Sequence, residues 1–328
     1  MASMKLRAAA LLSIAALSLT ACGSNTDTAA DANAADTKTV KITDNEGEKS
    51  VAVPPKSVVA TDNRTFETLD QWGIKLSAAA VTLMPDTISY TKDKDILDLG
   101  SHKEPNLESV VTVNPDLIIN GQRYIQHAEK FKELAPKATV ISLDPREGEP
   151  FDSELERQVT TLGEIFEKQD EAKKLVDDFE AAQKRVTDAY NKDETVMGLI
   201  ASGGELGYSA PSTGRTVGPM FDFLGLTPAL ELDESSTDHE GDDVSVEAIA
   251  KSNPDWIIVM DRDAAVAADG EEYKPAKDLL ENSEALQNVT ASKEGHVVVM
   301  PADTYTNEGI QTYTEFLNGF ADALEAAK

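Results

Sequence analysis

The sequence has one cysteine and few histidines. The first shortage limits how the fold can be stabilised, and the second limits which metal sites it can form. Cys22 has no second thiol with which to form a disulfide, so the stability of the folded chain has to come from its core. The four histidines, His102, His127, His239 and His296, are scattered along the chain. A receptor for free zinc or manganese needs several His and carboxylate ligands that converge on one point. The sequence therefore argues against such a receptor.

Basic residues are also scarce relative to acidic ones. The chain has 30 Lys and Arg against 59 Asp and Glu, which gives a formal net charge of -29. A nucleic-acid-binding protein needs a basic footprint, so this composition excludes nucleic acid as a partner. It does not exclude an anionic small ligand, because charges further away than a Debye length of about 8 Å are screened and a local cationic pocket can dominate.

The sequence lacks the short motifs that mark common classes of enzyme. It contains no Gly-x-Ser-x-Gly elbow, no Walker loop, no His-Glu-x-x-His and no closely spaced catalytic constellation. The glycines of Ser202–Gly207 do not match a dinucleotide fingerprint, and we expect a flexible loop there. These absences favour a protein that is not an enzyme.

Long apolar runs are missing except for Ala8–Leu19. This run is too short to span a bilayer, which takes about 20 apolar residues. Lys5 and Arg7 precede it and Leu-Thr-Ala-Cys22 follows it, which is the order of regions in an export signal. We expect residues 1–21 to be removed, which leaves Cys22 as a lipid-bearing N-terminus. The alternative is an ordinary signal peptide with an incidental cysteine.

The segment after this cysteine has a biased composition. Residues 22–38 contain mostly Ala, Asp, Thr and Asn and no large apolar side chain. Such a segment cannot bury enough surface to offset the entropy of ordering. We therefore predict a flexible tether.

The remainder of the chain contains an internal duplication. Glu108–Ile119 and Glu247–Ile258 align without a gap at a constant offset of 139 residues. Each copy predicts a short amphipathic helix, an Asn-Pro-Asp turn and a buried apolar strand. An arginine follows seven residues after the Asp of the turn in both copies, at Arg123 and Arg262.

The symmetry extends upstream in a looser form. The apolar strand Val58–Ala60 is followed by Arg64, and the apolar strand Val196–Ala201 is followed by Arg215. Each half thus repeats strand, arginine-bearing loop, helix, strand and arginine-bearing loop. Short apolar strands that alternate with helices predict parallel α/β lobes.

Residues 153–191 separate the two halves and contain no proline. Their apolar residues recur at three- and four-residue steps and predict a short helix followed by a long one, from Gln169 to Tyr190. A helix of that length spans roughly 30 Å at 1.5 Å per residue, enough to cross between lobes. We expect this stiff connection to limit lobe motion.

The sequence therefore predicts an α/β fold with two Rossmann-like lobes joined by a single long helix. The expected boundaries are 39–168 for the N-terminal lobe, 169–191 for the interlobe helix and 192–328 for the C-terminal lobe.

Four arginines are placed where such folds bind ligands, beyond the carboxyl ends of the strands. Arg64, Arg123, Arg215 and Arg262 are expected to converge on a cleft between the lobes. The guanidinium group is a planar fork of donors that matches oxyanions and stacks on aromatic faces, so the ligand implied is anionic and aromatic. The alternative is that these arginines form surface ion pairs with some of the many acidic residues.

Two further residues are candidates for the cleft. Tyr305 follows the apolar strand Val297–Met300, and His239 lies in an acidic loop. Either could hydrogen-bond to a ligand, or coordinate a metal that another chelator holds. The alternative for both is loop packing or exposure to solvent.

Several of these features together resemble the iron-siderophore-binding lipoproteins of Gram-positive ABC importers, a family of class III periplasmic-binding-protein-like proteins. The resemblance is carried by Leu-Thr-Ala-Cys22, by the segment Gly100–Glu108, by the paired Asn-Pro-Asp turns, and by Gly-Arg215 and Asp-Arg262. It covers essentially the whole mature chain. It implies a lipid-anchored, extracytoplasmic protein that gives its ligand to a permease dimer and the ATPase of that importer, and that needs no cofactor.

The branch most similar to this chain binds ferric catecholates. The resemblance implies that Arg123, Arg215 and Arg262 contact the ligand, with His239 and Tyr305 nearby, and that the siderophore itself holds the iron. Arg64 departs from the pattern, since a loop of small residues is expected there. That departure suggests a fourth contact or a different anion.

The resemblance also assigns a role to two glutamates. Glu108 and Glu247 are equivalent under the duplication, and the family docks one glutamate from each lobe onto arginines of the permease. The alternative is that both simply favour the helix dipole at a helix N-terminus. Haem, corrinoid, and hydroxamate or carboxylate siderophores remain open as ligands on the same fold.

Overall fold

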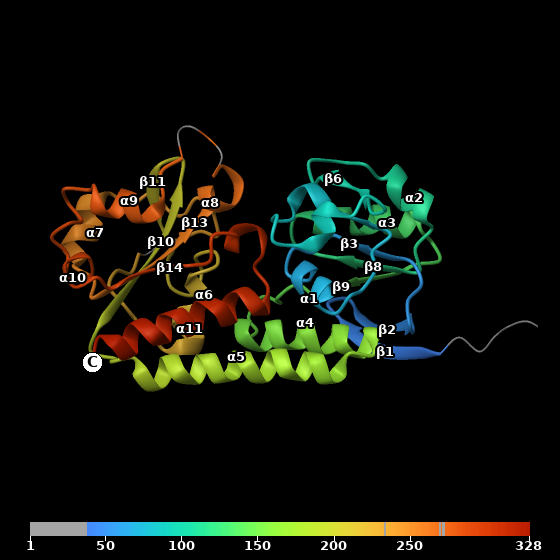
Figure 1. Cartoon of the computed structure of the whole chain (residues 1–328), viewed down its shortest axis with the longest axis horizontal. Helices are drawn as coiled ribbons and strands as arrows, with labels where there is room; N and C mark the ends of the chain where they lie inside the picture. Colours follow the sequence, from blue (N-terminus) through green and yellow to red (C-terminus); the bar gives the residue numbers. More distant parts are fainter. Residues whose placement is uncertain (1–37, 233, 269, 271–272) are drawn as a thin grey trace, which may run out of the picture. The chain divides into compact units, whose positions relative to one another are not determined.

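The computed structural model describes residues 38–328 except 233, 269 and 271–272, and they belong to one compact unit (Figure 1). Cys22 and the predicted signal segment lie outside the described residues. Within the described part of the chain, no helix is both long enough and apolar enough to cross a membrane.

The N-terminal lobe is built on a parallel sheet in the order β5-β4-β3-β8-β9. Its central strands consist of buried residues only, as expected where helices cover both faces of a parallel sheet. Two small antiparallel pairs, β1-β2 and β6-β7, accompany the sheet. The strands are β1 (Thr39–Asp44), β2 (Gly47–Ala52), β3 (Val58–Ala60), β4 (Ala78–Ala79), β5 (Leu97–Asp98), β6 (Gly100–Ser101), β7 (Glu104–Pro105), β8 (Leu117–Asn120) and β9 (Thr139–Ser142).

Short helices connect these strands. Three are α-helices: α1 (Phe66–Gln71), α2 (Glu108–Val113) and α3 (Ala128–Leu134). Three are 3₁₀ helices: η1 (Val81–Leu83), η2 (Ser89–Lys92) and η3 (Gln122–His127). The last of these, η3, begins directly beyond the carboxyl end of β8.

The C-terminal lobe has a mixed sheet in the order β11-β10-β13-β14, with β12 also paired to β10. Its strands are β10 (Thr195–Ser202), β11 (Glu205–Tyr208), β12 (Thr227–Pro228), β13 (Trp256–Asp261) and β14 (Val297–Val299). Its short helices are α6 (Gly218–Leu224), α7 (Val246–Ser252), α8 (Arg262–Val266), α9 (Ala276–Glu281), α10 (Thr290–Glu294) and η4 (Thr304–Thr306).

The prediction of a flexible loop at Ser202–Gly207 is wrong. Ser202 and Glu205 face each other as the last pair of an antiparallel hairpin between β10 and β11. Gly203 and Gly204 form its turn with φ of +61° and +78°. A two-residue hairpin turn of this kind needs positive φ at both positions, which glycine adopts without steric cost.

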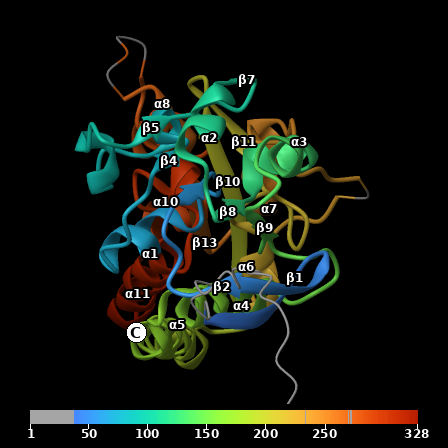
Figure 2. The same ribbon diagram turned by 90° about the vertical axis from the view of Figure 1, so that its right-hand side faces the viewer.

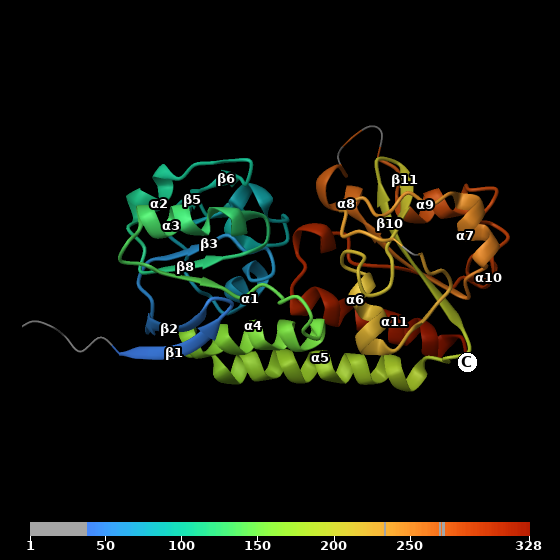
Figure 3. The ribbon, with the colours of Figure 1, turned by 180° about the vertical axis from the view of Figure 1, so that it is seen from behind.

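Three long helices form a layer beneath both sheets, as Figures 2 and 3 show from two sides. They are α4 (Phe151–Phe166), α5 (Gln169–Ala189) and α11 (Ile310–Ala326). Helix α5 begins at the predicted residue and runs under both lobes (Figure 3), packed along α4 and α11. Its buried residues Ala172, Phe179, Ala182 and Val186 form the predicted apolar stripe. The predicted fold class, two α/β lobes joined by one long helix, is confirmed.

The duplicated Asn-Pro-Asp turns have the same backbone conformation and the same hydrogen-bonding role in both lobes. The asparagine ends its helix in the left-handed conformation, with φ of 43° at Asn114 and 49° at Asn253. The aspartate then accepts hydrogen bonds from the start of the neighbouring strand: Asp116 from the backbone of Ser57 at 3.0 Å, and Asp255 from Thr195 at 2.7 Å. The repeat thus fixes where each central strand begins.

The segment that leads into α11 is bonded to the N-terminal lobe although it follows the last strand of the C-terminal lobe. We call residues 303–309 the bridging segment. Its hydrogen bonds to the other lobe include those that join Thr87 to Asp303 (2.7 Å), Asn63 to the carbonyl of Thr306 (2.9 Å) and Asn307 to Glu67 (2.8 Å).

Candidate functional site

A cavity of about 880 Å³ is lined by residues of both lobes. Much of its lining is basic or aromatic, in contrast to the acidic chain as a whole. The lining residues are Thr82, Leu83, Met84, His102, Lys103, Arg123, Arg215, Ser236, Thr237, Asp238, His239, Arg262, Ala265, Val266, Tyr305 and Thr306.

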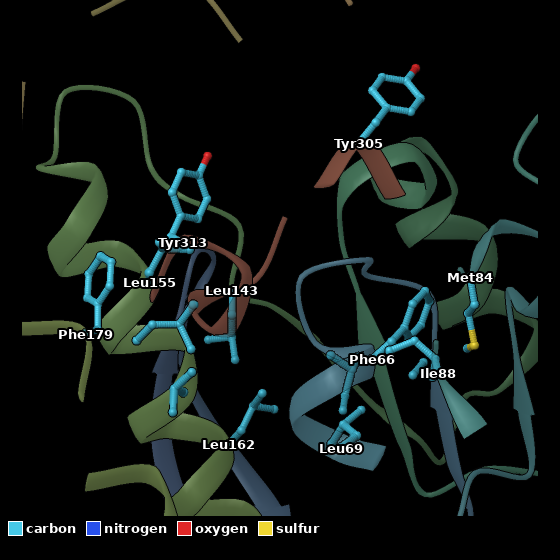
Figure 4. Close-up of a cluster of buried hydrophobic side chains, with 14 of the residues drawn as sticks. Phe66, Leu69, Met84, Ile88, Leu143, Leu155, Leu162, Phe179, Tyr305 and Tyr313 are labelled. Atoms are coloured by element: carbon cyan, nitrogen blue, oxygen red, sulfur yellow. The ribbon is translucent and has the colours of Figure 1, made fainter. Parts of the chain in front are cut away.

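Three guanidinium groups surround the ring of Tyr305. Their central carbons lie 4.7 Å (Arg123), 4.8 Å (Arg215) and 5.0 Å (Arg262) from the ring centroid. Figure 4 shows this tyrosine standing apart from core residues such as Phe66, with its hydroxyl directed away from them. Each cation–π contact contributes on the order of 1 kcal/mol, so the ring helps to hold three like charges together.

Arg123 follows β8 in the first turn of η3. Its position depends on Gly121, since a Cβ there would lie 2.5 Å from the carboxylate of Asp62. Gln122, next to the arginine, has a φ of +51°, a strained conformation for a residue with a side chain. One Arg123 nitrogen, Nη2, donates to the carbonyl of Tyr305 at 3.4 Å, while Nη1 is buried without a partner.

Arg262 is the first residue of α8, directly beyond the carboxyl end of β13. The side chain of Asp261 caps this helix by accepting from the backbone of Ala264 at 2.9 Å. Arg262 Nη1 donates to Ser202 at 3.0 Å and lies 3.5 Å from Asp263, while its Nε is buried without a partner.

Arg215 is held by Glu308 of the bridging segment. Its Nε and Nη2 donate to the two carboxylate oxygens at 3.0 and 2.8 Å. The loop before it is tight, because a Cβ on Gly214 would lie 2.4 Å from the backbone nitrogen of Ala210. Glu308 also accepts from Thr216 and from Gln122, both at 2.6 Å.

The cluster of arginines alters the acidity of Tyr305. Burial alone would raise the pKa of its phenol, but hydrogen bonding and charge interactions with Arg262, Arg123 and Arg215 outweigh burial and lower the pKa from its ordinary value of 10.0. The unpartnered nitrogens of Arg123 and Arg262 carry a cost, since a buried donor without an acceptor loses about 1–3 kcal/mol.

The structure brings together most of the residues selected from the sequence. His239 also lines the cavity, with its ring centroid 6.5 Å from that of Tyr305. Arg64 is not among the lining residues. Its guanidinium lies 3.3 Å from Asp144 and 3.9 Å from Glu308, so it supports the base of the site rather than its surface.

The two glutamates selected as docking residues lie outside the cavity, one on each lobe. Glu108 is the first residue of α2 and Glu247 lies in the first turn of α7, and both are exposed. Figure 1 labels the two helices.

Several residues of the site were missed at the level of sequence, among them Glu308, Gln122, His102 and Lys103, of which the last two line the cavity. The last two belong to Gly100–Glu108, a segment that the family resemblance had already marked. Glu308 is one of 59 acidic residues and follows no motif, so nothing in the sequence distinguishes it. Across the described residues, no group of three or more His, Cys, Asp or Glu side chains is arranged to hold a metal ion.

Known proteins resemble the chain over most of its length. The sequence model of the periplasmic binding protein family matches residues 58–304. The petrobactin-binding protein YclQ of Bacillus subtilis is 31% identical over 324 residues, which cover 95% of this chain and 96% of that protein. The ferric-anguibactin-binding protein FatB of Vibrio anguillarum is 28% identical over 269 residues, or 81% of each chain.

The fold is similar to that of a solved relative as well. The crystal structure of YclQ matches with a TM-score of 0.74 and 28% identity, covering 88% of this chain and 99% of that one.

Proposed function

This chain belongs to the periplasmic binding protein family, whose members are substrate-binding proteins and not enzymes, and we propose that it captures a ferric siderophore outside the cytoplasm for an ABC importer. The observation that carries the proposal is the ring of Arg123, Arg215 and Arg262 around Tyr305, in a cavity between two lobes. The names of relatives that bind ferric siderophores support it.

We further propose that the ligand is an anionic ferric catecholate. A ferric tris-catecholate has three net negative charges on oxygens beside flat aromatic rings. Guanidinium groups can donate to such oxygens and stack on such rings, and each charge-assisted hydrogen bond contributes about 1.5–3 kcal/mol. All three arginines line the cavity, so a ligand held there can accept hydrogen bonds from them.

His239 and Tyr305 are proposed to approach the iron where the siderophore leaves coordination positions open. A phenolate oxygen is a suitable ligand for iron, and the lowered pKa of Tyr305 favours its deprotonation. The iron is otherwise held by the siderophore and belongs to the cargo, so the protein itself needs no cofactor.

The proposal is tested with a panel of iron-loaded and iron-free siderophores, with quenching of the fluorescence of Trp72 and Trp256 as the signal. Iron-loaded catecholates should quench at low concentration. Selective quenching by hydroxamates or carboxylates alone would overturn the catecholate assignment. Binding of haem or a corrinoid in place of every siderophore would overturn the proposed function.

Attachment to the membrane is proposed through Cys22, with residues 1–21 removed and residues 22–38 as the tether. Two or more acyl chains would anchor the protein stably, at about 0.8 kcal/mol for each buried CH₂. Cys22→Ser should move the protein from the membrane to the soluble fraction. A variant that stays with the membrane would contradict the lipid anchor.

The partner is proposed to be a permease dimer with its ATPase, with Glu108 docked on one subunit and Glu247 on the other. Both carboxylates are exposed and neither lines the cavity. The surface that meets the importer is thus separate from the surface that meets the ligand.

A further inference from the structure

A cluster of charged side chains adjoins the cavity, and only one of its members, Arg215, belongs to the lining. The cluster has three carboxyl groups but only two guanidinium groups. Its segments come from both lobes: the loop after β3, the loop after β9, the bridging segment and the loop before α6. The members are Asp62, Asp144, Glu308, Arg64 and Arg215.

Both guanidinium groups of the cluster already have a carboxylate partner. Arg64 lies 3.3 Å from Asp144, and Arg215 donates to the two oxygens of Glu308 at 3.0 and 2.8 Å. Asp62 forms no ion pair with any residue that the structure describes, although it is 0% exposed. One carboxyl group of the cluster therefore has no counter-charge of its own.

The surroundings of Asp62 suit a carboxylic acid better than a carboxylate. Its two oxygens accept from neutral groups only, the backbone nitrogen of Arg64 at 2.9 Å and Gln158 Nε2 at 3.0 Å. A buried carboxylate without a counter-charge is costly, and such a group takes up a proton instead. The Gln158 amide fits both forms, because an amide donates to a carboxylate in one orientation and accepts from a carboxylic acid in the other.

The acidity of Asp62 agrees with this count of charges. Burial first, and then the charge of Asp144, raise its pKa from the ordinary value of 3.8 to about 7, although the charge and backbone amide of Arg64 oppose the rise. The charge of Glu308 adds to the rise. The groups that face the cluster from the other packed elements are uncharged: Gln158 of α4, Gly121 and Gln122 at the start of η3, Thr216 before α6 and the phenol of Tyr313 in α11.

The cluster reaches the ligand-binding arginines through Asp144. This carboxylate accepts from the backbone nitrogen of Gln122, the residue before Arg123, at 2.9 and 3.1 Å. A negative charge on Asp62 would draw Arg64 away from Asp144. It would also add negative potential behind the arginines of the cavity. Both effects oppose the binding of an anion.

We propose that Asp62 carries a proton at neutral pH and that release of this proton weakens capture of the anionic ligand, so that the site binds ligand and proton together. The second half of the inference rests on the proposed function, whereas the first follows from the fold alone. A ligand that binds more tightly to the protonated protein must also strengthen binding of the proton. Asp62 therefore favours capture below about pH 7 and opposes it as the pH rises through that value.

Infrared spectroscopy of the ligand-free protein tests the proton itself. A protonated carboxyl group has a C=O stretch that a carboxylate lacks, and the wild type should lose such a band between about pH 6 and about pH 8, above the range in which ordinary carboxyl groups titrate. Asp62→Asn has the shape of the protonated side chain and should fold, but its spectra should lack this change. A band that the variant retains, or the absence of one from the wild type, would overturn the proposal.

Titration with ferric enterobactin, a tris-catecholate with six donor atoms on one chelator, tests the coupling. The affinity of the wild type relative to that of Asp62→Asn should fall about fivefold between about pH 6 and about pH 8, the lower end for coupling between two sites. Comparison at the same pH removes changes in the ligand itself. A ratio that stays constant over this range would overturn the coupling. Absence of binding by both proteins would contradict the proposed function, and the infrared result would stand without it.

Asp44→Asn is the matched control. Asp44 is also buried and belongs to the same lobe, but Lys49 lies 3.9 Å away, and its carboxylate accepts from the backbone of Ser142 at 3.1 Å. It does not line the cavity. The control should match the wild type both in the infrared band and in the pH dependence of affinity. Loss of the same band in the control but not in Asp62→Asn would assign the proton to another carboxyl group and overturn the proposal.

Discussion

Glu308 accepts two hydrogen bonds from Arg215, at 3.0 and 2.8 Å, although its side chain is only 2% exposed. Burial alone would raise the pKa of this carboxyl. The charges of Arg215 and Arg64, with hydrogen bonds from Arg215 and Thr216, outweigh burial and lower the pKa to about 2. Glu308 is thus an internal anion that fixes one arginine of the cavity before any ligand arrives.

Glu308→Gln should remove a pH-dependent part of the stability. The folded protein holds the Glu308 pKa at about 2, below its ordinary value of 4.5, so the stabilisation is complete above that ordinary value and is lost as pH falls towards 2. The free energy of unfolding of the wild type should fall relative to that of the variant by on the order of 2 kcal/mol between about pH 6 and about pH 3.

Urea denaturation of both proteins at several pH values measures this difference. If the difference stayed constant down to about pH 3, Glu308 would not be an ionised, stabilised carboxylate in the folded protein.

Arg262→Ala should weaken binding of a ferric catecholate at least tenfold, because it removes one charge-assisted donor worth about 1.5–3 kcal/mol. Fluorescence titration measures the affinity. Arg185→Ala is the control, since Arg185 pairs with Asp322 and Glu325 between α5 and α11 and does not line the cavity. Equal affinities in both variants and the wild type would show that the cavity is not the binding site.

Tyr305→Phe should distinguish contact with iron from a role of the ring alone. The variant keeps the aromatic face that the three guanidinium groups surround but loses the phenol. For a siderophore with only four donor atoms, we expect affinity to fall about tenfold, equivalent to 1.4 kcal/mol, and the visible absorption band of the complex to shift. A siderophore with six donor atoms should show neither change. Identical spectra for wild type and variant with the four-donor ligand would contradict coordination by Tyr305.

Glu108→Ala combined with Glu247→Ala should leave ligand affinity intact and stop uptake of the iron complex by cells. Both side chains are exposed and away from the cavity, so folding and capture should not depend on them. Glu104→Ala with Glu234→Ala is a control that removes two other exposed carboxylates, one from each lobe. Normal transport by the first double variant would rule out the docking role.

The sequence predicted the parts of the fold that depend on periodicity and repetition. The stripe of α5 and the duplicated Asn-Pro-Asp turns are local patterns, and each fixes local geometry: a buried helix face in the first case, the start of a strand in the second. Because ligands bind beyond the carboxyl ends of the strands in such folds, Arg123 after β8 and Arg262 after β13 could each be placed at the ligand-binding edge of its own sheet without a structure.

The sequence could not separate Arg64 from Arg215. Both follow a first strand, and both precede a threonine, yet only Arg215 lines the cavity. The difference comes from Asp144, which lies 3.3 Å from Arg64 but 80 positions away along the chain. Glu308 was missed for the same reason, since its partners Arg215 and Gln122 come from distant parts of the chain. Side-chain partners across such separations leave no local pattern.

The bridging segment limits how an importer can distinguish the loaded protein from the empty one. It carries Tyr305 and is bonded to the N-terminal lobe, while α11, which follows it, packs along the helix that runs under both lobes. Rotation of one lobe against the other would have to break these bonds, so we expect the separation of Glu108 and Glu247 to stay nearly constant on loading. Small-angle X-ray scattering of the empty and loaded protein should then give the same radius of gyration. A permease would then have to distinguish the loaded protein from the empty one by contact with the ligand that is exposed at the mouth of the cavity.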